Sequence, residues 1–346
     1  MKIAVAMSGG VDSSVAAALL KKEGHDVIGL TMLVTPSEEA AVAAREVTQM
    51  LGIPHYLFDF EDVFTKQVIS VFCHEYSLGR TPNPCINCNK LMKFGVLFDK
   101  AWDLGAEKIA TGHYARLENG PSCNRIQLNK GIDHKRDQSY FLYKLNQEQL
   151  AGSLFPLGDL TKDKVREMAA EMELPVTKRK ESREICFIPD NDYPSFVRKH
   201  LTAEYKSGLI VDTKGNILGK HDGLINYTIG QRKGLGVSSR EPLYVVDIDN
   251  SNNTVIVGGK QEIYADEFVV KDLNWIAIEK IIDPMTVKTK IRYLHPEAES
   301  VITKLKDSTV HVKFSKPQMA ITPGQAAVFY IGDTVVGGGT IDRVLH

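Results

Sequence analysis

Residues 2–23 read KIAVAMSGGVDSSVAAALLKKE, and the expected architecture follows from this segment. The apolar run from Lys2 to Met7 predicts a buried strand, and the Ala-rich run from Ser13 to Glu23 predicts a helix soon after it. A glycine-containing connection from a strand to a helix is typical of parallel sheets, whose strands are joined by crossover helices. We therefore expect this stretch to open an α/β domain.

The same alternation continues along the first half of the chain. Short β-branched runs alternate with stretches of helical period. The order predicts an α/β fold with a doubly wound parallel sheet for residues 1–200. The predicted elements are a strand at Val27 to Met32, a helix at Ala40 to Leu51, a strand at His55 to Phe58, a helix at Val63 to Leu78 and a strand at Lys108 to Thr111.

Beyond about residue 200 the hydrophobic period changes from helical to two residues. Short alternating runs are divided by Gly, Asp and Asn turns, as in YVVDIDNSNNTVIVGG. We expect a small central β domain at residues 201–263 and a C-terminal β-barrel at residues 264–346, with the acidic stretch from Tyr264 to Glu267 at the boundary.

The composition is that of a globular protein. Of the 346 residues, 43% are hydrophobic and 25% are charged, which excludes a disordered or fibrous chain. The sequence has no apolar run near the roughly 20 residues that cross a bilayer. It also starts with a strand-like run in place of the basic and apolar segments of a signal peptide. We therefore expect a cytoplasmic monomer with no membrane partner.

Local basic clusters, and not the net charge, are the features that could indicate a nucleic-acid partner. The formal net charge is −1, so the total gives no indication of a polyanionic partner. Each basic cluster, taken singly, is equally compatible with a solvated surface and with a nucleic-acid contact. The clusters are Lys135 and Arg136; Lys178, Arg179, Lys180 and Arg183; Arg232 and Lys233; and Lys288, Lys290 and Arg292.

The connection SGGVDSS at residues 8–14 has the composition of an anion-binding loop. Glycines let the backbone approach a ligand closely, and the amides and positive dipole end of the following helix face outward. Ser8, Ser13 and Ser14 add hydroxyl donors. The loop lacks the GxxxxGKS/T spacing of a Walker A motif and the glycine spacing of the dinucleotide fingerprint.

This loop resembles the PP-loop of ATP pyrophosphatases. The resemblance implies a site that holds the pyrophosphate of ATP while a substrate oxygen attacks the α-phosphate and forms an adenylate. Asp12 would then hold Mg²⁺ or orient phosphate, because charge on the leaving pyrophosphate must be neutralised. PP-loop enzymes adenylate very different acceptors, so the loop leaves the substrate open.

Five cysteines, an odd number, argue against a disulfide framework and favour catalytic, redox or metal-binding roles. Cys85 and Cys88 lie in the proline-stiffened stretch TPNPCINCNK, just before a predicted helix, whose dipole we expect to lower the pKa of the Cys88 thiol. Cys186 lies in the apolar, strand-like run ICFI. Cys73 is expected to be a buried apolar residue and Cys123 an accessible turn residue, with no role assigned to either.

Nine motifs together resemble the family of bacterial tRNA-specific 2-thiouridylases and cover most of the chain. They stand in the family's order: SGGVDSS, RTPNPxxxCNK, ATGHYAR, DQSYFLY, LGDLTKxxVR, SxxICFI, YTIGQRKGLG, IRY and PGQ. The resemblance implies an enzyme that uses ATP to adenylate C2 of the wobble uridine, position 34, and then to replace its oxygen by sulfur. It further implies the lysine, glutamate and glutamine tRNAs as substrates.

The resemblance also implies roles for two thiols. Cys186 would receive sulfur as a persulfide from a donor protein, and Cys88 would be the nucleophile that completes transfer to the activated uridine. The pair would end each turnover as a disulfide, or release sulfide.

One position departs from the family pattern. The family's loop reads NPDxxC, and here Cys85 replaces the aspartate, so no carboxylate is available as a general base at that position. The three thiols Cys85, Cys88 and Cys186 could instead hold an iron–sulfur cluster with an open iron that carries sulfide. A CxxC pair is also compatible with a plain redox couple or half of a zinc site.

By motif position the resemblance places both ligands on particular residues. The ATP positions are carboxyl ends of predicted strands, where a doubly wound sheet binds ligands. Core packing is the other interpretation for Met32 and His113. The ATP site comprises Ala6, Met7, Ser8, Gly9, Gly10, Val11, Asp12, Ser13, Met32 and Gly112. The tRNA site comprises Asn83, Pro84 and Cys85 near the target base, with His113, Arg136, Asp137, Gln138, Arg292, Tyr293 and Gln325.

The target uridine must leave the anticodon stack to reach a buried thiol, which a single-stranded loop allows at low cost. Arg136 stands where the family has lysine, so only the charge is retained. Arg232, Lys233 and the basic strand face from Lys288 to Arg292 would bind phosphates.

Two other classes of function remain compatible with parts of the sequence. Another PP-loop adenylating enzyme, such as an amidotransferase partner or a ligase, would explain the loop but not the paired cysteines. An RNA-binding or ATP-sensing module without turnover would leave Cys88 and Cys186 without a role.

Overall fold

The computed structural model describes residues 1–35, 37–120, 125–177, 179, 185–188, 192–201, 206–306 and 308–345. The first half is built on a five-stranded parallel sheet of order β3-β2-β1-β4-β7. Its strands are β1 (Lys2–Ala6), β2 (Asp26–Leu33), β3 (His55–Asp59), β4 (Lys108–Ala110) and β7 (Ser153–Leu154). The predicted parallel α/β sheet is confirmed.

Helices cover both faces of this sheet because its strands are apolar on both sides. Ile3 and Val5 pack against three helices: α1 (Val11–Lys22), α2 (Glu39–Leu51) and α9 (Lys162–Glu171). Ala4, between them in sequence, points to the opposite face and joins the core formed by the helical segments at residues 61–77 and 84–103. The sheet is therefore doubly wound, as predicted.

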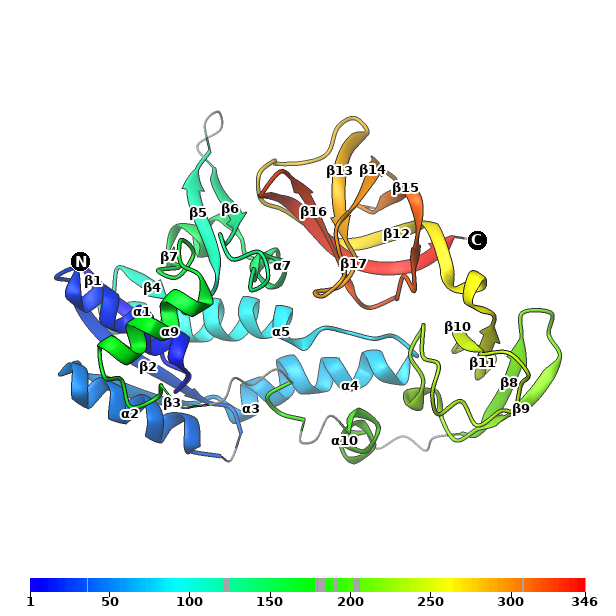
Figure 1. Cartoon of the computed structure of the whole chain (residues 1–346), viewed down its shortest axis with the longest axis horizontal. Coiled ribbons are helices and arrows are strands. Elements are labelled where there is room, and N and C mark those ends of the chain that lie inside the picture. The colour runs from blue at the N-terminus through cyan, green and yellow to red at the C-terminus, as the bar shows by residue number, and fades with distance from the viewer. Residues whose placement is uncertain are drawn as a thin grey trace.

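Two long helical segments lead away from the sheet. The first runs through α3 (Glu61–Phe64), the π-helical η1 (Thr65–Ile69) and α4 (Ser70–Ser77). The second runs through α5 (Pro84–Asn87), the π-helical η2 (Cys88–Val96) and α6 (Leu97–Asp103). In Figure 1 the barrel stands above the second segment, and the central β sheet lies beyond the far end of α4.

A β-hairpin links the N-terminal half to the C-terminal half. It consists of β5 (Ala115–Asn119) and β6 (Ile126–Lys130), and β6 pairs with β17 of the barrel through Asn129 and Thr334. The short helices α7 (Ser139–Leu142) and α8 (Gln147–Ala151) follow it. This hairpin was not among the predicted elements.

A separate four-stranded sheet of order β10-β11-β8-β9 forms the central β module. Helix α10 (Tyr193–His200) precedes it. The module has its own small core around Ile210, Val245 and Val255. Its elements are β8 (Gly208–Asp212), β9 (Ile217–His221), η4 (Leu224–Asn226), β10 (Tyr244–Asp249), β11 (Thr254–Gly258) and η5 (Lys260–Ile263).

The C-terminal strands close into a six-stranded antiparallel barrel. Their order is β12-β15-β14-β13-β16-β17, and pairing of β12 with β17 closes the barrel around Phe268, Phe314 and Phe329. The strands are β12 (Tyr264–Trp275), β13 (Met285–Lys290), β14 (Ala298–Lys304), β15 (Val310–Met319), β16 (Ala326–Ile331) and β17 (Thr334–Leu345). The predicted β-barrel is confirmed. Within the described residues, no helix is both long and apolar enough to span a membrane.

Candidate active site

The loop between β1 and α1 has the geometry of an anion cradle. Gly9 has a φ of +67°, and a Cβ there would lie 2.5 Å from the Ala40 carbonyl oxygen, so only glycine fits without strain. Gly10 is the N-cap of α1 and brings no side chain to cap the first-turn amides. These amides and the helix dipole therefore favour a bound anion.

The serines of the loop organise the loop itself. The Ser13 hydroxyl accepts a hydrogen bond from the Ser8 amide at 3.2 Å and donates one to the Gly10 carbonyl at 3.2 Å. The buried Ser14 hydroxyl donates to the same carbonyl at 2.8 Å. The expectation that all three hydroxyls face a ligand is therefore corrected for Ser13 and Ser14, which fix the turn that presents the amides.

The apolar members of the predicted ATP site have a packing role. Met7 and Val11 are buried in the core beneath the loop, so only their backbone atoms can face a ligand. Ala6 and Met32 are half-buried and pack against the core on the other face of the sheet. Both lie at the carboxyl ends of their strands, the edge at which the loop opens.

Gly112 follows β4 and touches the loop from the neighbouring strand. A Cβ at this position would lie 2.7 Å from the Asp12 carbonyl carbon and 2.8 Å from the Ser13 amide nitrogen. Both are backbone atoms and cannot move independently of the loop. Glycine at residue 112 therefore allows two strands to converge on one anion cradle.

Asp12 is held by two residues far away in the sequence. Lys162 Nζ donates to both carboxylate oxygens at 2.7 and 2.9 Å, and the Tyr114 hydroxyl donates to Oδ1 at 2.8 Å. Lys162 is only 5% exposed. Both residues lie within motifs of the sequence, but their role could not be predicted, because contacts across 102 and 150 residues leave no local signal.

This arrangement limits the predicted role of Asp12 toward Mg²⁺. Magnesium bound with a nucleotide needs one or two protein carboxylates beside the phosphate oxygens. Asp12 fits as one such carboxylate, provided that Lys162 releases it. A further cation, Arg179, donates to the Gly9 carbonyl oxygen at 3.0 Å. Its predicted cluster partners Lys178, Lys180 and Arg183 lie outside the described residues.

The cysteine-containing stretch starts a helix earlier than predicted. Asn83 is the N-cap of α5 and accepts from the Cys85 amide at 3.1 Å, and the buried Pro84 occupies the first turn. Cys85 therefore lies at the helix N-terminus, and Cys88 lies one turn further along, where η2 begins. The helix dipole acts most strongly on Cys85, not on Cys88 as predicted.

Cys186 lies in a turn and not in the predicted strand. The Ile188 amide donates to the Ile185 carbonyl at 3.0 Å, which closes a β-turn over Cys186 and Phe187. Phe187 is buried between the rings of Phe64 and Phe72, at centroid distances of 5.5 and 5.6 Å. The next residue, Ile188, is buried as well. Cys186 remains exposed.

The three predicted site cysteines come together in the fold. Burial, with additional contributions from the nearby Cys186 and Cys85, raises the pKa of the Cys88 thiol to about 12. Lys93 opposes this shift. Burial also raises the pKa of Cys85 and of Cys186, and Lys93 opposes both shifts. Although Cys85 and Cys186 are partly exposed, surrounding protein desolvates their sulfurs. The predicted low pKa of Cys88 is therefore wrong for the resting protein, because desolvation outweighs the helix dipole.

His113, which shares the influence of Lys93 with these thiols, is a buried neutral residue. Its Nδ1 shares a 2.7 Å hydrogen bond with the Thr111 hydroxyl, and its ring packs between Phe94 and Phe155. Burial, together with Lys93, holds its pKa well below the usual value. Core packing, the second interpretation given for His113, describes its surroundings.

The part of the chain that the structure describes shows no metal-binding arrangement of the thiols. Among the residues that the structure describes, no group of three or more His, Cys, Asp or Glu side chains is placed to hold a metal ion. The predicted iron–sulfur site at Cys85, Cys88 and Cys186 therefore does not fit this arrangement, because a cluster needs convergent thiolates. Cys73 is buried, as predicted, and Cys123 lies outside the described residues.

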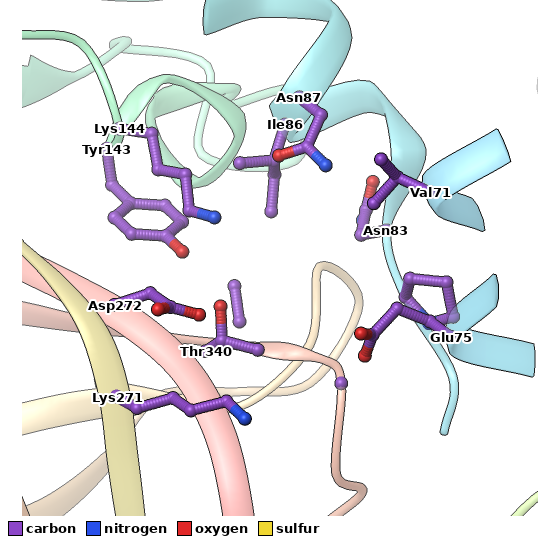
Figure 2. Close-up of a pocket in the computed structure, with 13 residues that line it drawn as sticks. Val71, Glu75, Asn83, Ile86, Asn87, Tyr143, Lys144, Lys271, Asp272 and Thr340 are labelled. Atoms are coloured by element: carbon purple, nitrogen blue, oxygen red, sulfur yellow. The ribbon is translucent and has the colours of Figure 1, made fainter. Parts of the chain in front are cut away.

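A cavity of about 140 Å³ lies behind the cysteine helix, against the barrel (Figure 2). Asn83, Ile86 and Asn87 line it from the helix side. Lys144, Lys271, Asp272 and Thr340 line it from the other side. Neither Cys85 nor Cys88 faces this cavity, so it is distinct from the thiol site.

The predicted tRNA residues in the first half are partly committed to internal contacts. Asp137 is buried and accepts from the Ser139 amide at 3.1 Å and the Ser139 hydroxyl at 2.9 Å. Burial raises its pKa despite these hydrogen bonds. The Gln138 side chain accepts from the Tyr114 amide at 3.0 Å. Asp137 and Gln138 thus hold the loop that presents the half-buried Arg136.

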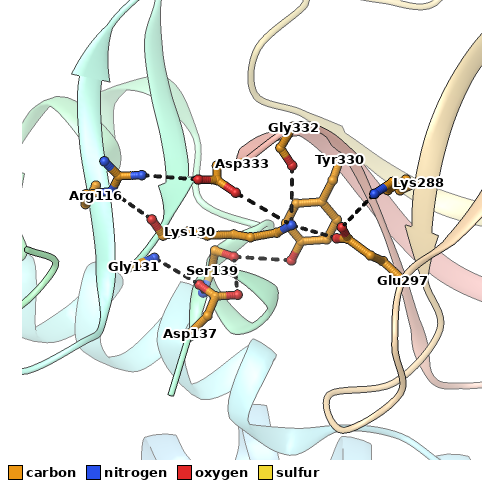
Figure 3. A network of polar contacts seen from close by, with 10 residues as sticks. All are labelled: Arg116, Lys130, Gly131, Asp137, Ser139, Lys288, Glu297, Tyr330, Gly332 and Asp333. Atoms are coloured by element: carbon orange, nitrogen blue, oxygen red, sulfur yellow. Dashed lines mark hydrogen bonds and ion pairs between the residues drawn. The ribbon is translucent and has the colours of Figure 1, made fainter. Parts of the chain in front are cut away.

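Asp137 belongs to a network that joins the hairpin to the barrel (Figure 3). Lys130 Nζ forms an ion pair with Glu297 at 2.7 Å and lies 4.6 Å from the centre of the Tyr330 ring. The Tyr330 hydroxyl lies 3.2 Å from the Ser139 hydroxyl, next to Asp137. The network fixes the barrel relative to the loop that carries Arg136.

The predicted tRNA residues of the barrel lie at the same junction. Tyr293 packs against Phe141 of the N-terminal half, at a centroid distance of 4.4 Å. Its neighbour Arg292 is half-buried. Gln325 donates to the Thr81 carbonyl at 2.8 Å, just ahead of the cysteine helix. Two segments of the barrel therefore contact the N-terminal half at this junction.

Family models match almost the whole chain in three consecutive parts. A tRNA methyl transferase HUP domain matches residues 1–190, and a tRNA methyl transferase PRC-barrel domain matches residues 194–259. An aminomethyltransferase beta-barrel domain matches residues 265–341.

Curated relatives are similar along their full length. The tRNA-specific 2-thiouridylase MnmA of Acetivibrio thermocellus is 49% identical, with 98% of this chain and 99% of the relative covered. That of Clostridioides difficile is 46% identical, with 99% of each chain covered. Among solved structures, a 4-thiouridine synthetase in complex with RNA and ATP covers 57% of this chain and 49% of its own, at 17% identity and a TM-score of 0.37.

Proposed function

The chain belongs to the family of tRNA-specific 2-thiouridylases, and on this premise we propose how its nucleotide loop and its thiols take part in one reaction. The activity is the ATP-dependent 2-thiolation of the wobble uridine of tRNA, so the chain is a tRNA sulfurtransferase. What remains to be assigned is the role of each residue.

In the first step, O2 of the uridine attacks the α-phosphate of ATP, and pyrophosphate leaves. The first-turn amides of α1 hold the pyrophosphate. Two cations contact the loop: Lys162 binds the Asp12 carboxylate, and Arg179 binds the Gly9 carbonyl. Both can shift from these groups to phosphate oxygens. Mg²⁺ bound with ATP would neutralise phosphate charge, with Asp12 as its protein contact.

In the second step, the terminal sulfur of a Cys186 persulfide adds to C2, and AMP leaves. The Cys88 thiolate then attacks the Cys186 sulfur and breaks the bond between the two sulfurs. The released electron pair stays on the sulfur at C2, giving 2-thiouridine, and Cys88 and Cys186 are left as a disulfide. Lys93 favours each thiolate in turn because it lowers the pKa of both thiols.

The macromolecular partners follow from the same premise. Residues 201–263 and 264–346 would contact tRNA, with Asn83, Pro84 and Cys85 near the everted base and Arg136, Arg292 and Tyr293 at other tRNA contacts. The lysine, glutamate and glutamine tRNAs are the proposed substrates. A persulfide-carrying donor protein would load Cys186, which is exposed on its turn.

One observation supports the relay most directly: the turn that carries Cys186 buries Phe187 in the core against which Cys88 packs, although Cys88 and Cys186 are remote in sequence. Consistent with this, Cys186 raises the pKa of the Cys88 thiol. The test measures pyrophosphate release from ATP and 2-thiouridine formation in parallel, with and without tRNA. Cys88→Ser and Cys186→Ser should retain tRNA-dependent pyrophosphate release and lose 2-thiouridine. Cys73→Ser, a buried cysteine outside the site, is the matched control.

Two outcomes would contradict the proposal. A Cys186→Ser enzyme that still thiolates tRNA would remove the persulfide from the mechanism. Pyrophosphate release that does not depend on tRNA would favour adenylation of a different acceptor.

A further inference from the structure

Cys85 is a third thiol at the site, and the reaction proposed above leaves it without a role. It is exposed at the N-terminus of α5, whereas Cys88, one turn further along the same helix, is half-buried. The turn that carries Cys186 packs on the same core as this helix, because Phe187 and Ile86 are buried in one cluster against which Cys88 also packs. Cys186 also raises the pKa of both Cys85 and Cys88. Cys186 could therefore form a disulfide with either of the two helix cysteines, Cys85 or Cys88.

The helical backbone fixes the spacing between Cys85 and Cys88. Asn83 caps the helix through the Cys85 amide at 3.1 Å, and Pro84 stiffens the first turn. Residues three apart on a helix have Cβ atoms about 5 to 6 Å apart, and a disulfide needs about 3.5 to 4.5 Å. A Cys85–Cys88 disulfide is therefore reachable with a small distortion, and such a strained, exposed bond is easily reduced.

We propose that Cys85 is the resolving thiol that frees Cys186 after each turnover; the proposal rests on the relay described above. The Cys85 thiolate attacks the Cys88 sulfur of the Cys88–Cys186 disulfide. A Cys85–Cys88 bond forms, the Cys88–Cys186 bond breaks, and Cys186 leaves as a thiolate that takes up a proton. No electrons are gained or lost in this exchange. An external dithiol reductant then reduces the bond within the helix.

The exchange makes Cys186 accessible to the sulfur donor again. A Cys88–Cys186 disulfide ties the turn at Ile185–Ile188 to the helix and keeps Cys186 from a sulfur donor. A Cys85–Cys88 disulfide lies within one helix and places no constraint on that turn. The enzyme can therefore accept the next sulfur before it is fully reduced.

The test locates the disulfide after one turnover. Full-length protein carrying a persulfide on Cys186, loaded with a small-molecule polysulfide, is mixed with ATP and tRNA without reductant. The reaction is quenched with N-ethylmaleimide, and peptides are mapped without reduction. We expect a Cys85–Cys88 disulfide with Cys186 alkylated in the wild type, and a Cys88–Cys186 disulfide in Cys85→Ser.

Cys85→Asp, which restores the family's residue, should also retain the Cys88–Cys186 disulfide, because a carboxylate cannot exchange. With limiting dithiothreitol, the multiple-turnover rate of Cys85→Ser and of Cys85→Asp should fall at least about five-fold. The amount of 2-thiouridine formed in the first turnover should stay the same. A wild-type enzyme whose only disulfide joins Cys88 and Cys186, with Cys85 alkylated, would overturn the proposal even though thiolation proceeds.

A second measurement does not depend on thiolation. One equivalent of diamide, added to resting protein without tRNA, should yield the Cys85–Cys88 disulfide. A product dominated by Cys88–Cys186 would overturn the resolving role. Loss of thiolation together with a normal Cys85–Cys88 disulfide would instead count against the relay.

Discussion

At the scale of single residues, Lys162 is the side chain whose removal should affect the nucleotide loop most. Lys162→Met leaves the Asp12 carboxylate without its cation and removes a positive charge from the cradle. We expect ATP affinity, measured by calorimetry, to fall at least ten-fold. The free energy of unfolding should fall by between about 1 kcal/mol, as for an exposed pair, and about 3 kcal/mol, as for a buried one.

Lys164 supplies the control on the same helix. It is exposed and pairs with Glu167 at 2.8 Å, so Lys164→Met should change neither quantity by more than about 0.5 kcal/mol. Equal effects of the two substitutions would show that helix α9, and not the contact with Asp12, is responsible.

The high pKa of Cys88 predicts an unusual pH dependence of its reactivity. Burial raises this pKa to about 12, so the thiol stays protonated across the neutral range. Alkylation of Cys88 by iodoacetamide, followed by peptide mass spectrometry, should be slow at pH 8 and rise about ten-fold per pH unit through pH 10. A plateau below pH 9 would contradict the burial of the sulfur.

The raised pKa of Cys88 also makes the free energy of unfolding depend on pH. A thiol with a raised pKa in the folded state favours folding below its ordinary pKa, and this contribution is lost as the pH rises toward about 12. Cys88→Ser should therefore reduce the loss of stability between pH 9 and pH 11, as followed by urea unfolding.

At the scale of elements, the junction of β4 with the nucleotide loop depends on Gly112. Gly112→Ala places a Cβ within 3 Å of the Asp12 and Ser13 backbone, so the loop must shift. We expect a loss of about 1 to 3 kcal/mol in unfolding free energy and a loss of ATP binding. Gly259→Ala, where the nearest atom is 3.5 Å away and the backbone is extended, should be close to neutral.

The sequence predicted the elements whose signals are local. The alternation of buried strands and crossover helices, the change to a two-residue period and the loop SGGVDSS all depend on short stretches, and the corresponding sheet and barrel are present. The strand predicted around Cys186 failed because the burial of Phe187 depends on rings from Phe64 and Phe72, which are remote in sequence.

The site was less predictable than the fold for the same physical reason. The contact of Lys162 with Asp12 spans 150 residues, and no periodicity reports it. The pKa of Cys88 could not be inferred from its distance to a helix end, because desolvation by the surrounding chain exceeds the dipole. Motif order could identify both thiols, but the proximity of Cys186 to the other two cysteines depends on packing.

At the scale of the whole molecule, charged contacts with the hairpin help to position the barrel. Glu297 joins Lys130 at 2.7 Å and Lys288 at 3.6 Å (Figure 3). Because Lys130 and Glu297 are mostly buried, Glu297→Gln should loosen the barrel relative to the catalytic domain. We expect the KM for tRNA to rise about three- to ten-fold, with ATP affinity unchanged, since the nucleotide loop lies far from this contact.

A double-mutant cycle separates this effect from a general loss of charge. If Lys130 and Glu297 act as a pair, Lys130→Met and the double variant should resemble Glu297→Gln, with a coupling energy of about 1 kcal/mol or more in unfolding. Glu299→Gln, an exposed change two residues along the same segment, should leave the KM for tRNA as it is. Additive effects of Lys130→Met and Glu297→Gln, or an equal effect of Glu299→Gln, would mean that the barrel is positioned by its apolar contacts instead.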